Sequence, residues 1–268
     1  MSSLPALIRL AHPLPTTLNA VVAAGLTLVA GGRVDQAALA AITMLGVHTS
    51  IGALNDLLDR GTDHGRVEKP LATGEVSERT ARTVIATGAA IGLGAASMLG
   101  ALSLQIAALG ATLGYLYDVG IKRTWASFLP FAIGVSLIPL FAWSAASREP
   151  SLHILLLSAA AIPGGSALAL QNALADFSLD AAAGMRSVVV RIGERAARTA
   201  AAVLHLVAWL TISLSGAAPL PAQVIGGALL VIGLALGWQP GVQTRRRGWE
   251  ISALGLACCA FGLALSRS

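Results

Sequence analysis

Charged residues are scarce in this chain: Asp, Glu, Lys and Arg together make up 12% of its 268 residues. Ordinary soluble domains contain roughly 25%. Hydrophobic residues account for 55% of the chain, and a helical protein of this composition would have no polar faces to present to water. The scarcity of charge therefore excludes an ordinary soluble domain.

Cysteine is nearly absent as well. The two cysteines, Cys258 and Cys259, are adjacent and lie within an apolar segment. Adjacent thiols cannot link distant parts of the chain, and no metal-ligand spacing surrounds them. The sequence also lacks a linker and a low-complexity tail, which indicates a single domain over residues 1–268.

Long apolar segments, in contrast, fill most of the chain. A helix needs roughly 20 mostly apolar residues to cross a bilayer. Such segments lie near residues 14–31, 36–55, 80–99, 101–117, 126–145, 151–171, 196–215, 221–237 and 249–266. They predict an all-α integral membrane protein with about nine transmembrane helices.

The basic residues predict an orientation in the membrane. If the segments cross in alternation, all but three of the 18 Lys and Arg residues fall on one side, and the exceptions are Arg33, Arg148 and Arg267. Positive residues stay cytoplasmic, so we expect a cell-membrane protein whose polar loops face the cytoplasm. This distribution accounts for the net charge of +5 without a nucleic-acid partner. The Arg245–Arg247 cluster is also expected to contact anionic membrane lipids.

An acidic pattern occurs twice in this charge-poor chain. The spacing Asn-x-x-x-Asp-x-x-x-Asp is found at residues 55–63 and again at residues 172–180, each time at the end of an apolar segment. Residues four apart on a helix share one face, and Asp56, Asp59 and Asp63 also fit that face, so each copy predicts an acidic ridge. Two facing ridges would repel unless a cation lay between them. Oxygen ligands of this kind suit Mg²⁺, which takes further ligands from substrate phosphates. The pattern predicts an enzyme that handles an organic diphosphate.

A third polar feature lies on the same side of the membrane. Tyr117 and the pair Lys122–Arg123 connect two apolar segments. A tyrosine beside two cations is common as an anchor at the membrane interface. Beside acidic clusters, fixed cations can also neutralise the oxygens of a leaving phosphate. The sequence leaves both interpretations open.

Together these motifs resemble those of the UbiA superfamily of intramembrane prenyltransferases. The family pattern Asn-Asp-x-x-Asp-x-x-x-Asp is matched over residues 55–63. A second pattern, Asp-x-x-x-Asp, is matched at Asp176 and Asp180, with the usual downstream glycine at Gly184. The family's basic-Pro-Leu segment followed by glycine is similar to residues 69–74.

Two features depart from the family pattern. Ala173 stands where many members carry another acid, and one extra residue separates Tyr117 from Lys122. The resemblance still covers nearly the whole chain. It implies nine helices around a central cavity that opens to the cytoplasm and laterally to lipid.

The resemblance also implies roles for individual residues. Mg²⁺ on the diphosphate would be held by Asn55, Asp56, Asp59, Asp63, Asp176 and Asp180. The five aspartates of this set are the expected catalytic residues. The diphosphate itself would be bound or positioned by Arg66, Lys69, Tyr117, Lys122, Arg123 and Asn172. An apolar tunnel would take the isoprenoid tail and shield the allylic cation from water. The implied reaction is Mg²⁺-dependent prenyl transfer from an isoprenyl diphosphate to an aromatic or lipid-like acceptor.

Two other classes of membrane protein place carboxylates in this way. A CDP-alcohol phosphotransferase carries Asp-Gly and Ala-Arg pairs within one aspartate series, which Asp59-Arg60-Gly61 does not match. An ion-coupled transporter binds cations at intramembrane carboxylates, normally near the bilayer midplane, whereas these motifs lie at the ends of the apolar segments. Release of pyrophosphate distinguishes the prenyltransferase from both.

Overall fold

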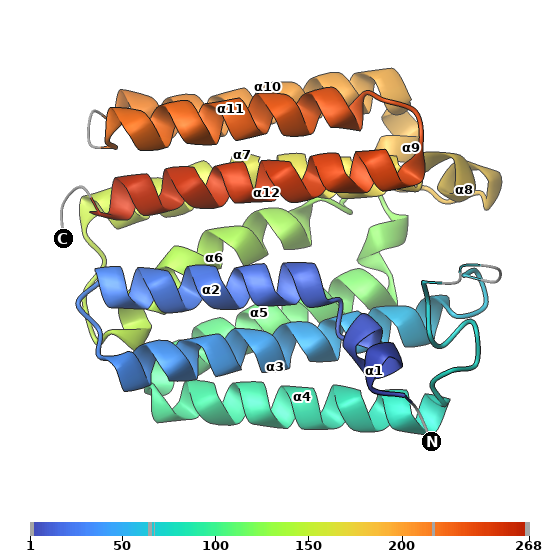
Figure 1. Ribbon diagram of the computed structural model, residues 1–268, viewed down its shortest axis with the longest axis horizontal. Coiled ribbons are helices and arrows are strands. Elements are labelled where there is room, and N and C mark those ends of the chain that lie inside the picture. The colour runs from blue at the N-terminus through green and yellow to red at the C-terminus, as the bar shows by residue number, and fades with distance from the viewer. Residues whose placement is uncertain (1–2, 64–65, 67, 216–217, 266–268) are drawn as a thin grey trace. The chain divides into compact units, whose positions relative to one another are not determined.

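The computed structural model describes residues 3–63, 66, 68–215 and 218–265 (Figure 1). These residues form α-helices joined by turns, with one short 3₁₀ helix and no strand. In chain order the helices are α1 (Leu4–Leu10), α2 (Pro13–Val29), α3 (Val34–Asp59), α4 (Glu78–Met98), α5 (Ala101–Val119), the 3₁₀ helix η1 (Ile121–Arg123), α6 (Leu129–Ala145), α7 (Leu152–Ala175), α8 (Phe177–Ala182), α9 (Val188–Ile192), α10 (Glu194–Leu214), α11 (Leu220–Gly237) and α12 (Val242–Leu265). The all-α expectation is confirmed.

Each apolar segment of the sequence overlaps one long helix of the described residues. Six of these helices have the length and hydropathy that a membrane crossing requires: α3, α4, α7, α10, α11 and α12. Helices α2 and α6 are apolar and slightly shorter, at 17 residues each. The lengths and hydropathy of these helices are thus those of a multi-pass membrane protein. The number of crossings and the central cavity remain predictions.

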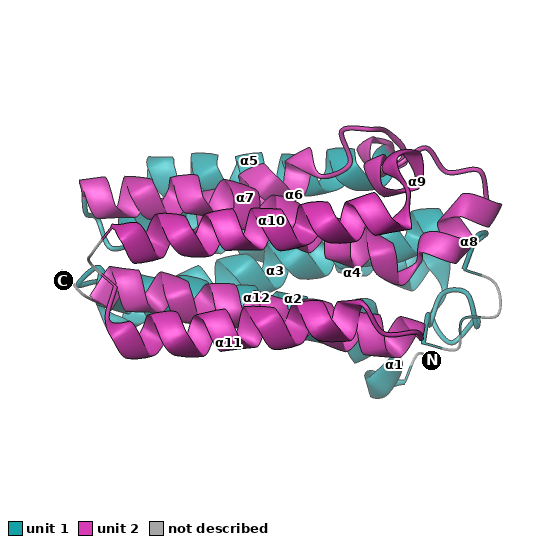
Figure 2. Cartoon of the chain, turned by 90° about the horizontal axis from the view of Figure 1, so that it is seen from above, with its two compact units in different colours: residues 1–119, 141–148 teal, residues 120–140, 149–268 magenta. Residues whose placement is uncertain are grey.

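Packing divides the chain into two compact units (Figure 2). Unit 1 contains residues 1–119 and 141–148, and unit 2 contains residues 120–140 and 149–268. Helix α6 contributes its first part to unit 2 and its last residues to unit 1. The first acidic motif belongs to unit 1 and the second to unit 2.

In unit 1, α3 packs against both α2 and α4 (Figure 1). Helices in lipid associate through close backbone contact at small residues. A Cβ added at Gly46 of α3 would lie 2.6 Å from the carbonyl oxygen of Gly88 on α4, and one at Gly92 would lie 2.8 Å from the backbone nitrogen of Val47. These glycines allow α4 to support the helix that carries the first acidic motif.

In unit 2, α7 packs against α10 and α12, and α11 packs along α12. The contact between α11 and α12 again depends on glycine, since a Cβ added at Gly248 would lie 2.5 Å from the carbonyl oxygen of Gly233. Three buried polar side chains also join the helices: Gln171 of α7 lies 2.8 Å from Nε2 of His205 on α10 and donates to Ser252 on α12 at 3.1 Å. Such bonds stabilise packed helices in lipid and here fix the end of α7 that precedes the second acidic motif.

Candidate active site

The first acidic motif lies at the end of α3. Asn55, Asp56 and Asp59 belong to this helix, which ends at Asp59 because Gly61 and the turn around it disfavour further helix. Asp63 therefore lies beyond the helix, and the expectation that it shares one continuous helical face with Asp56 and Asp59 is wrong. The backbone nitrogen of Asp63 still donates to the carbonyl oxygen of Asp59 at 2.9 Å. This extra turn returns Asp63, which is 7% exposed, to the acidic end of α3.

Asp56 is the most deeply buried residue of this motif, at 1% exposure. Its Oδ1 atom lies 2.5 Å from Nζ of Lys69 and 2.8 Å from Nε2 of His12. A buried carboxylate needs such partners because desolvation strongly disfavours an isolated charge. The Oδ2 atom is also buried and has no hydrogen-bond donor among the described residues. Asp56 therefore anchors Lys69 and still offers one oxygen atom to a cation.

His12 reaches Asp56 from an uncommon backbone conformation. It precedes α2 with φ 49° and ψ 66°, in the left-handed region. Residues other than glycine are rare there, and such strain is concentrated at functional sites. The ring packs on α3 at Gly52, where an added Cβ would lie 3.0 Å from Cδ2 of His12. Sequence spacing carries no signal for this contact, because 44 residues separate His12 from Asp56.

Asp63 is surrounded by charges of both signs. Nη1 of Arg66 lies 3.2 Å from Oδ1 of Asp63, and Nζ of Lys69 lies 3.9 Å from Oδ2. Burial raises the pKa of Asp63; Lys69 and Arg66 oppose the rise, while the carboxylates of Asp59 and Asp56 add to it. A bound cation would relieve this accumulation of negative charge. Arg66 and Lys69 thus gather at the first motif, as predicted.

Asn55 contacts a carboxylate that the sequence analysis did not select. Its Nδ2 atom donates to Oδ1 of Asp118 at 2.9 Å, and Asp118 is 3% exposed near the end of α5. Because the amide nitrogen is committed to Asp118, the amide oxygen is the atom of Asn55 that can bind a cation. An acid next to Tyr117 at the end of an apolar segment was the available signal.

The second acidic motif lies where α7 gives way to α8. Asn172 belongs to α7, Asp176 occupies the junction between the two helices, and Asp180 belongs to α8. The backbone nitrogen of Asp180 donates to the carbonyl oxygen of Asp176 at 3.0 Å, so the spacing of one helical turn is kept across the junction. Nη2 of Arg246, near the start of α12, lies 3.2 Å from Oδ1 of Asp176. The sequence indicated lipid contacts for Arg246 and carried no signal for this pair.

Tyr117 and the basic pair fall into different units. Tyr117 belongs to α5 of unit 1, whereas Lys122 and Arg123 belong to η1 of unit 2. Lys122 is only 7% exposed, but Arg123 is exposed. Lysine is almost never buried unless it is paired, so the buried Lys122 differs from a solvated interface anchor, and its role in the site stays a prediction. The exposure of Arg123 is compatible with the anchor interpretation.

The oxygen-rich donor set fits Mg²⁺ in the form in which this ion is usually bound. Within the described residues, no three His, Cys, Asp or Glu side chains lie close enough together to hold a metal ion. Mg²⁺ seldom needs such a cage, because it keeps several waters and combines one or two carboxylates with substrate phosphates. The buried Oδ2 of Asp56 and the amide oxygen of Asn55 are ligands of this type. The first motif therefore fits a cation that binds together with a phosphate substrate.

Comparison with known families decides among the three interpretations of the sequence. The sequence profile of the UbiA prenyltransferase family matches residues 18–258. The chain belongs to the UbiA prenyltransferase family. This membership confirms the resemblance and identifies the protein as a membrane prenyltransferase. It disfavours the transporter and the CDP-alcohol phosphotransferase.

Individual relatives agree with this assignment. The chain is 30% identical to the digeranylgeranylglyceryl phosphate synthase of Methanopyrus kandleri over 237 residues. The aligned region covers 85% of this chain and 83% of the relative. A UbiA homolog from Archaeoglobus fulgidus bound to GPP and Mg²⁺ has a TM-score of 0.74 at 19% identity, covering 98% of this chain and 100% of the other.

An apo UbiA homolog from Aeropyrum pernix K1 also has a TM-score of 0.74, at 20% identity, covering 93% of this chain and 96% of the other. At these identities the solved structures establish the fold. Both the Mg²⁺ and the isoprenyl diphosphate that the sequence predicts are bound in the Archaeoglobus fulgidus homolog.

Proposed function

We propose that this UbiA-family protein transfers a prenyl group from an isoprenyl diphosphate to a hydrophobic acceptor within the membrane, with Mg²⁺ as its cofactor and pyrophosphate as the leaving product. The observation that carries the proposal is the buried acidic end of α3, where Asp56 and Asp63 lie beside Lys69 and Arg66. Carboxylates and fixed cations in one place suit a metal–diphosphate substrate, whose two components carry opposite charges. The Archaeoglobus fulgidus homologs bound to GPP or DMAPP with Mg²⁺ support this choice.

We assign the metal ligands from both motifs. They are Asn55, Asp56, Asp59 and Asp63 of the first motif and Asp176 and Asp180 of the second. The residues proposed to bind or position the diphosphate are Arg66, Lys69, Tyr117, Lys122, Arg123 and Asn172. The whole chain, residues 1–268, then acts as one prenyltransferase domain.

The proposed reaction depends on stabilising the leaving group. Lys69 is held by Asp56 at 2.5 Å, so its ammonium is already oriented before the diphosphate binds. Bound Mg²⁺ would neutralise the charge that develops on departing pyrophosphate. The allylic carbon becomes cationic as its bond to oxygen breaks, and apolar helices shield it from water until the acceptor attacks.

We further propose that the protein lies in the cell membrane with both acidic motifs on the cytoplasmic side. The support is the distribution of Lys and Arg, nearly all of which fall on the side of the motifs. The acceptor is aromatic or lipid-like. Similarity to a digeranylgeranylglyceryl phosphate synthase favours a lipid-like acceptor.

The test is release of pyrophosphate by the purified protein in detergent. A panel of labelled isoprenyl diphosphates and acceptors should give a prenylated product and pyrophosphate in equal amounts, with Mg²⁺ and not after chelation by EDTA. Product formation unaffected by EDTA would remove Mg²⁺ from the proposal. Cation uptake into vesicles without pyrophosphate release would instead support the transporter.

A further inference from the structure

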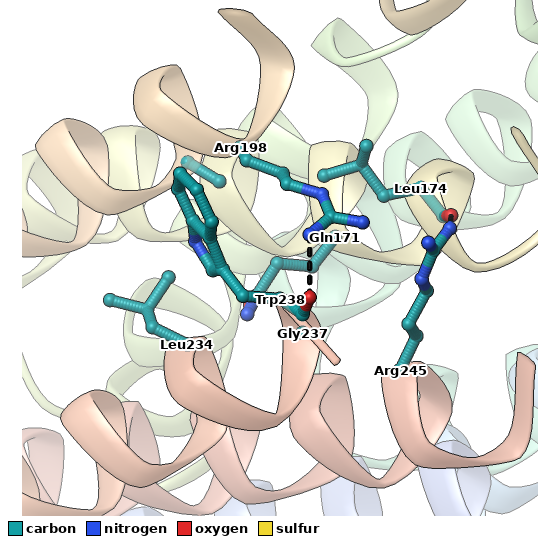
Figure 3. Close-up of a pocket in the computed structure, with 8 residues that line it drawn as sticks. Gln171, Leu174, Arg198, Leu234, Gly237, Trp238 and Arg245 are labelled. Carbon is teal, nitrogen blue, oxygen red and sulfur yellow. Dashed lines mark hydrogen bonds between the residues drawn. The ribbon is translucent and has the colours of Figure 1, made fainter. Parts of the chain in front are cut away.

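A recess in unit 2 is lined by none of the residues proposed to bind Mg²⁺ or the diphosphate. It is narrow, with a cavity volume of about 10 Å³, and lies at one end of α10 and α11 (Figure 3). Its walls include Gln171, Leu174, Arg198, Leu234, Trp238 and Arg245. Two basic side chains from different helices, α10 and α12, therefore point into one partly apolar hollow.

The two arginines retain positive charge in the recess. The side chains of Arg198 and Arg245 are only 12% and 19% exposed, and both contact Oε1 of Glu194, at 2.5 and 2.8 Å. One carboxylate cannot neutralise two guanidinium groups. Their other hydrogen-bond partners among the described residues are neutral carbonyl oxygens: Arg198 donates to Trp238 at 2.8 Å, and Arg245 donates to Leu174 and to Gln239, each at 3.2 Å. The bound carboxylate shows that an anion fits between the arginines.

The shape of these donors favours a phosphate group. Two guanidinium forks present several N–H groups, which match the oxygens of a phosphate better than those of a small halide ion. The guanidinium of Arg198 also lies 5.4 Å from the ring centre of Trp238, which holds it in place through a cation–π contact. Arg198 and Trp238 also line a second hollow, together with Glu194 and Arg195. The guanidinium of Arg198 is thus oriented before any ligand binds.

An apolar stripe extends from the recess along α11. Val224, Val231 and Trp238 follow one another at intervals of seven residues and so lie on one helical face. They are 58%, 67% and 49% exposed, respectively. Tryptophan is enriched where a membrane helix meets the headgroup layer. A ligand with a phosphate at Trp238 would therefore find an exposed apolar surface for hydrocarbon chains.

We propose that the recess binds the phosphate headgroup of an anionic membrane lipid, with Arg198 and Arg245 as the phosphate ligands and the α11 stripe as the surface for its chains. Glu194 occupies the position of the phosphate when no lipid is bound and is displaced by it. Free inorganic phosphate would share the arginine contacts but would gain nothing from Val224 and Val231. The proposal concerns binding alone and does not depend on prenyl transfer.

The experiment titrates phosphatidylglycerol into the purified full-length protein in neutral detergent and measures the unfolding temperature and native mass spectra. Phosphatidylglycerol should bind and raise the unfolding temperature, whereas phosphatidylcholine at the same concentration should not. Arg198→Gln and Arg245→Gln should each weaken the apparent affinity by about tenfold, the loss expected for a hydrogen bond between charged groups. Arg82→Gln is the matched control, because Arg82 is 71% exposed in unit 1 and does not line this recess.

Glu194→Gln distinguishes a binding site from a fold defect. The substitution removes the competing charge, so it should tighten phosphatidylglycerol binding, which a misfolded variant cannot do. Wild-type affinity in both arginine variants would overturn the site, and unchanged affinity in Glu194→Gln would overturn the displacement of Glu194. Inorganic phosphate that stabilises the protein at the same concentration as the lipid would overturn the lipid assignment.

Discussion

The two acidic motifs share one spacing but differ in how the fold holds them. At the first motif, Asp56 is 1% exposed and is contacted from the residue before α2 and from the loop after α3, by His12 and Lys69. At the second, Asp176 has a side chain 28% exposed at a junction between helices, where Arg246 contacts it. The same pattern of residues therefore lies in two different structural environments. The first motif is part of the packed interior of unit 1, and the second is part of a polar connection in unit 2.

This difference separates catalytic from structural consequences. A carboxylate paired in the interior contributes to folding and to chemistry together, because its removal leaves a cation without its partner. A carboxylate at a partly exposed junction can be removed with little effect on folding. Substitutions in the two motifs should therefore lower kcat to a similar degree but should differ in how far they lower the free energy of unfolding.

The largest expected effect is on turnover, and it should be the same in both motifs. Asp59→Ala and Asp176→Ala should each lower kcat by at least about a hundredfold, as loss of an electrostatic group at a reacting centre does. Steady-state measurement of pyrophosphate release checks this, with circular dichroism to confirm folding. Asp35→Ala is the control, because Asp35 is exposed at the other end of α3. Full activity in either motif variant would remove that residue from the catalytic set.

The next largest effect is on the free energy of unfolding, and it should differ between the two motifs. Asp56→Asn should lower the free energy of unfolding by about 3 kcal/mol, because it removes the carboxylate 2.5 Å from the Lys69 ammonium and leaves that ammonium only Asp63, 3.9 Å away. Asp180→Asn on the partly exposed α8 should change it by less than about 0.5 kcal/mol. Thermal unfolding in detergent measures both. Equal destabilisation by the two substitutions would contradict the distinction between the motifs.

The positions of the helices along the chain were largely predictable, because they depend on local composition. The apolar segment predicted at residues 221–237 matches α11 closely, whereas the segment predicted at 249–266 missed the start of α12 at Val242. Arg245, Arg246 and Arg247 lower the hydropathy there without disfavouring helix, since arginine has a high helix propensity. Hydropathy reports the part of a helix that lipid can cover. It does not report where the helix begins.

The contacts within the candidate site were much less predictable, for a physical reason. His12 and Asp56 are 44 residues apart, Asn55 and Asp118 are 63 apart, and Asp176 and Arg246 are 70 apart. Spacing along one helix identifies residues that share a face. It carries no information about which other helix supplies the partner, because that depends on tertiary packing.

A smaller effect concerns the basic pair of η1. Lys122→Ala should weaken binding of pyrophosphate with Mg²⁺ by about tenfold, because it removes a hydrogen bond between charged groups from a buried position. Arg123→Ala should weaken it less, since Arg123 is exposed and solvent screens its charge. Isothermal titration calorimetry compares the two. Unchanged affinity in Lys122→Ala would favour the interface anchor.

The smallest effect should come from His12, which acts on the first motif only through Asp56. Its Nε2 lies 2.8 Å from Oδ1 of Asp56, so His12→Ala should remove one hydrogen bond and raise the Mg²⁺ concentration for half-maximal activity by about fivefold. His12→Gln should restore most of the loss, because its amide can donate to the same oxygen. A purely structural role would lower the unfolding temperature in both variants without changing the Mg²⁺ requirement. If His12→Gln keeps the normal Mg²⁺ requirement and His12→Ala does not, the hydrogen bond from residue 12 orients Asp56.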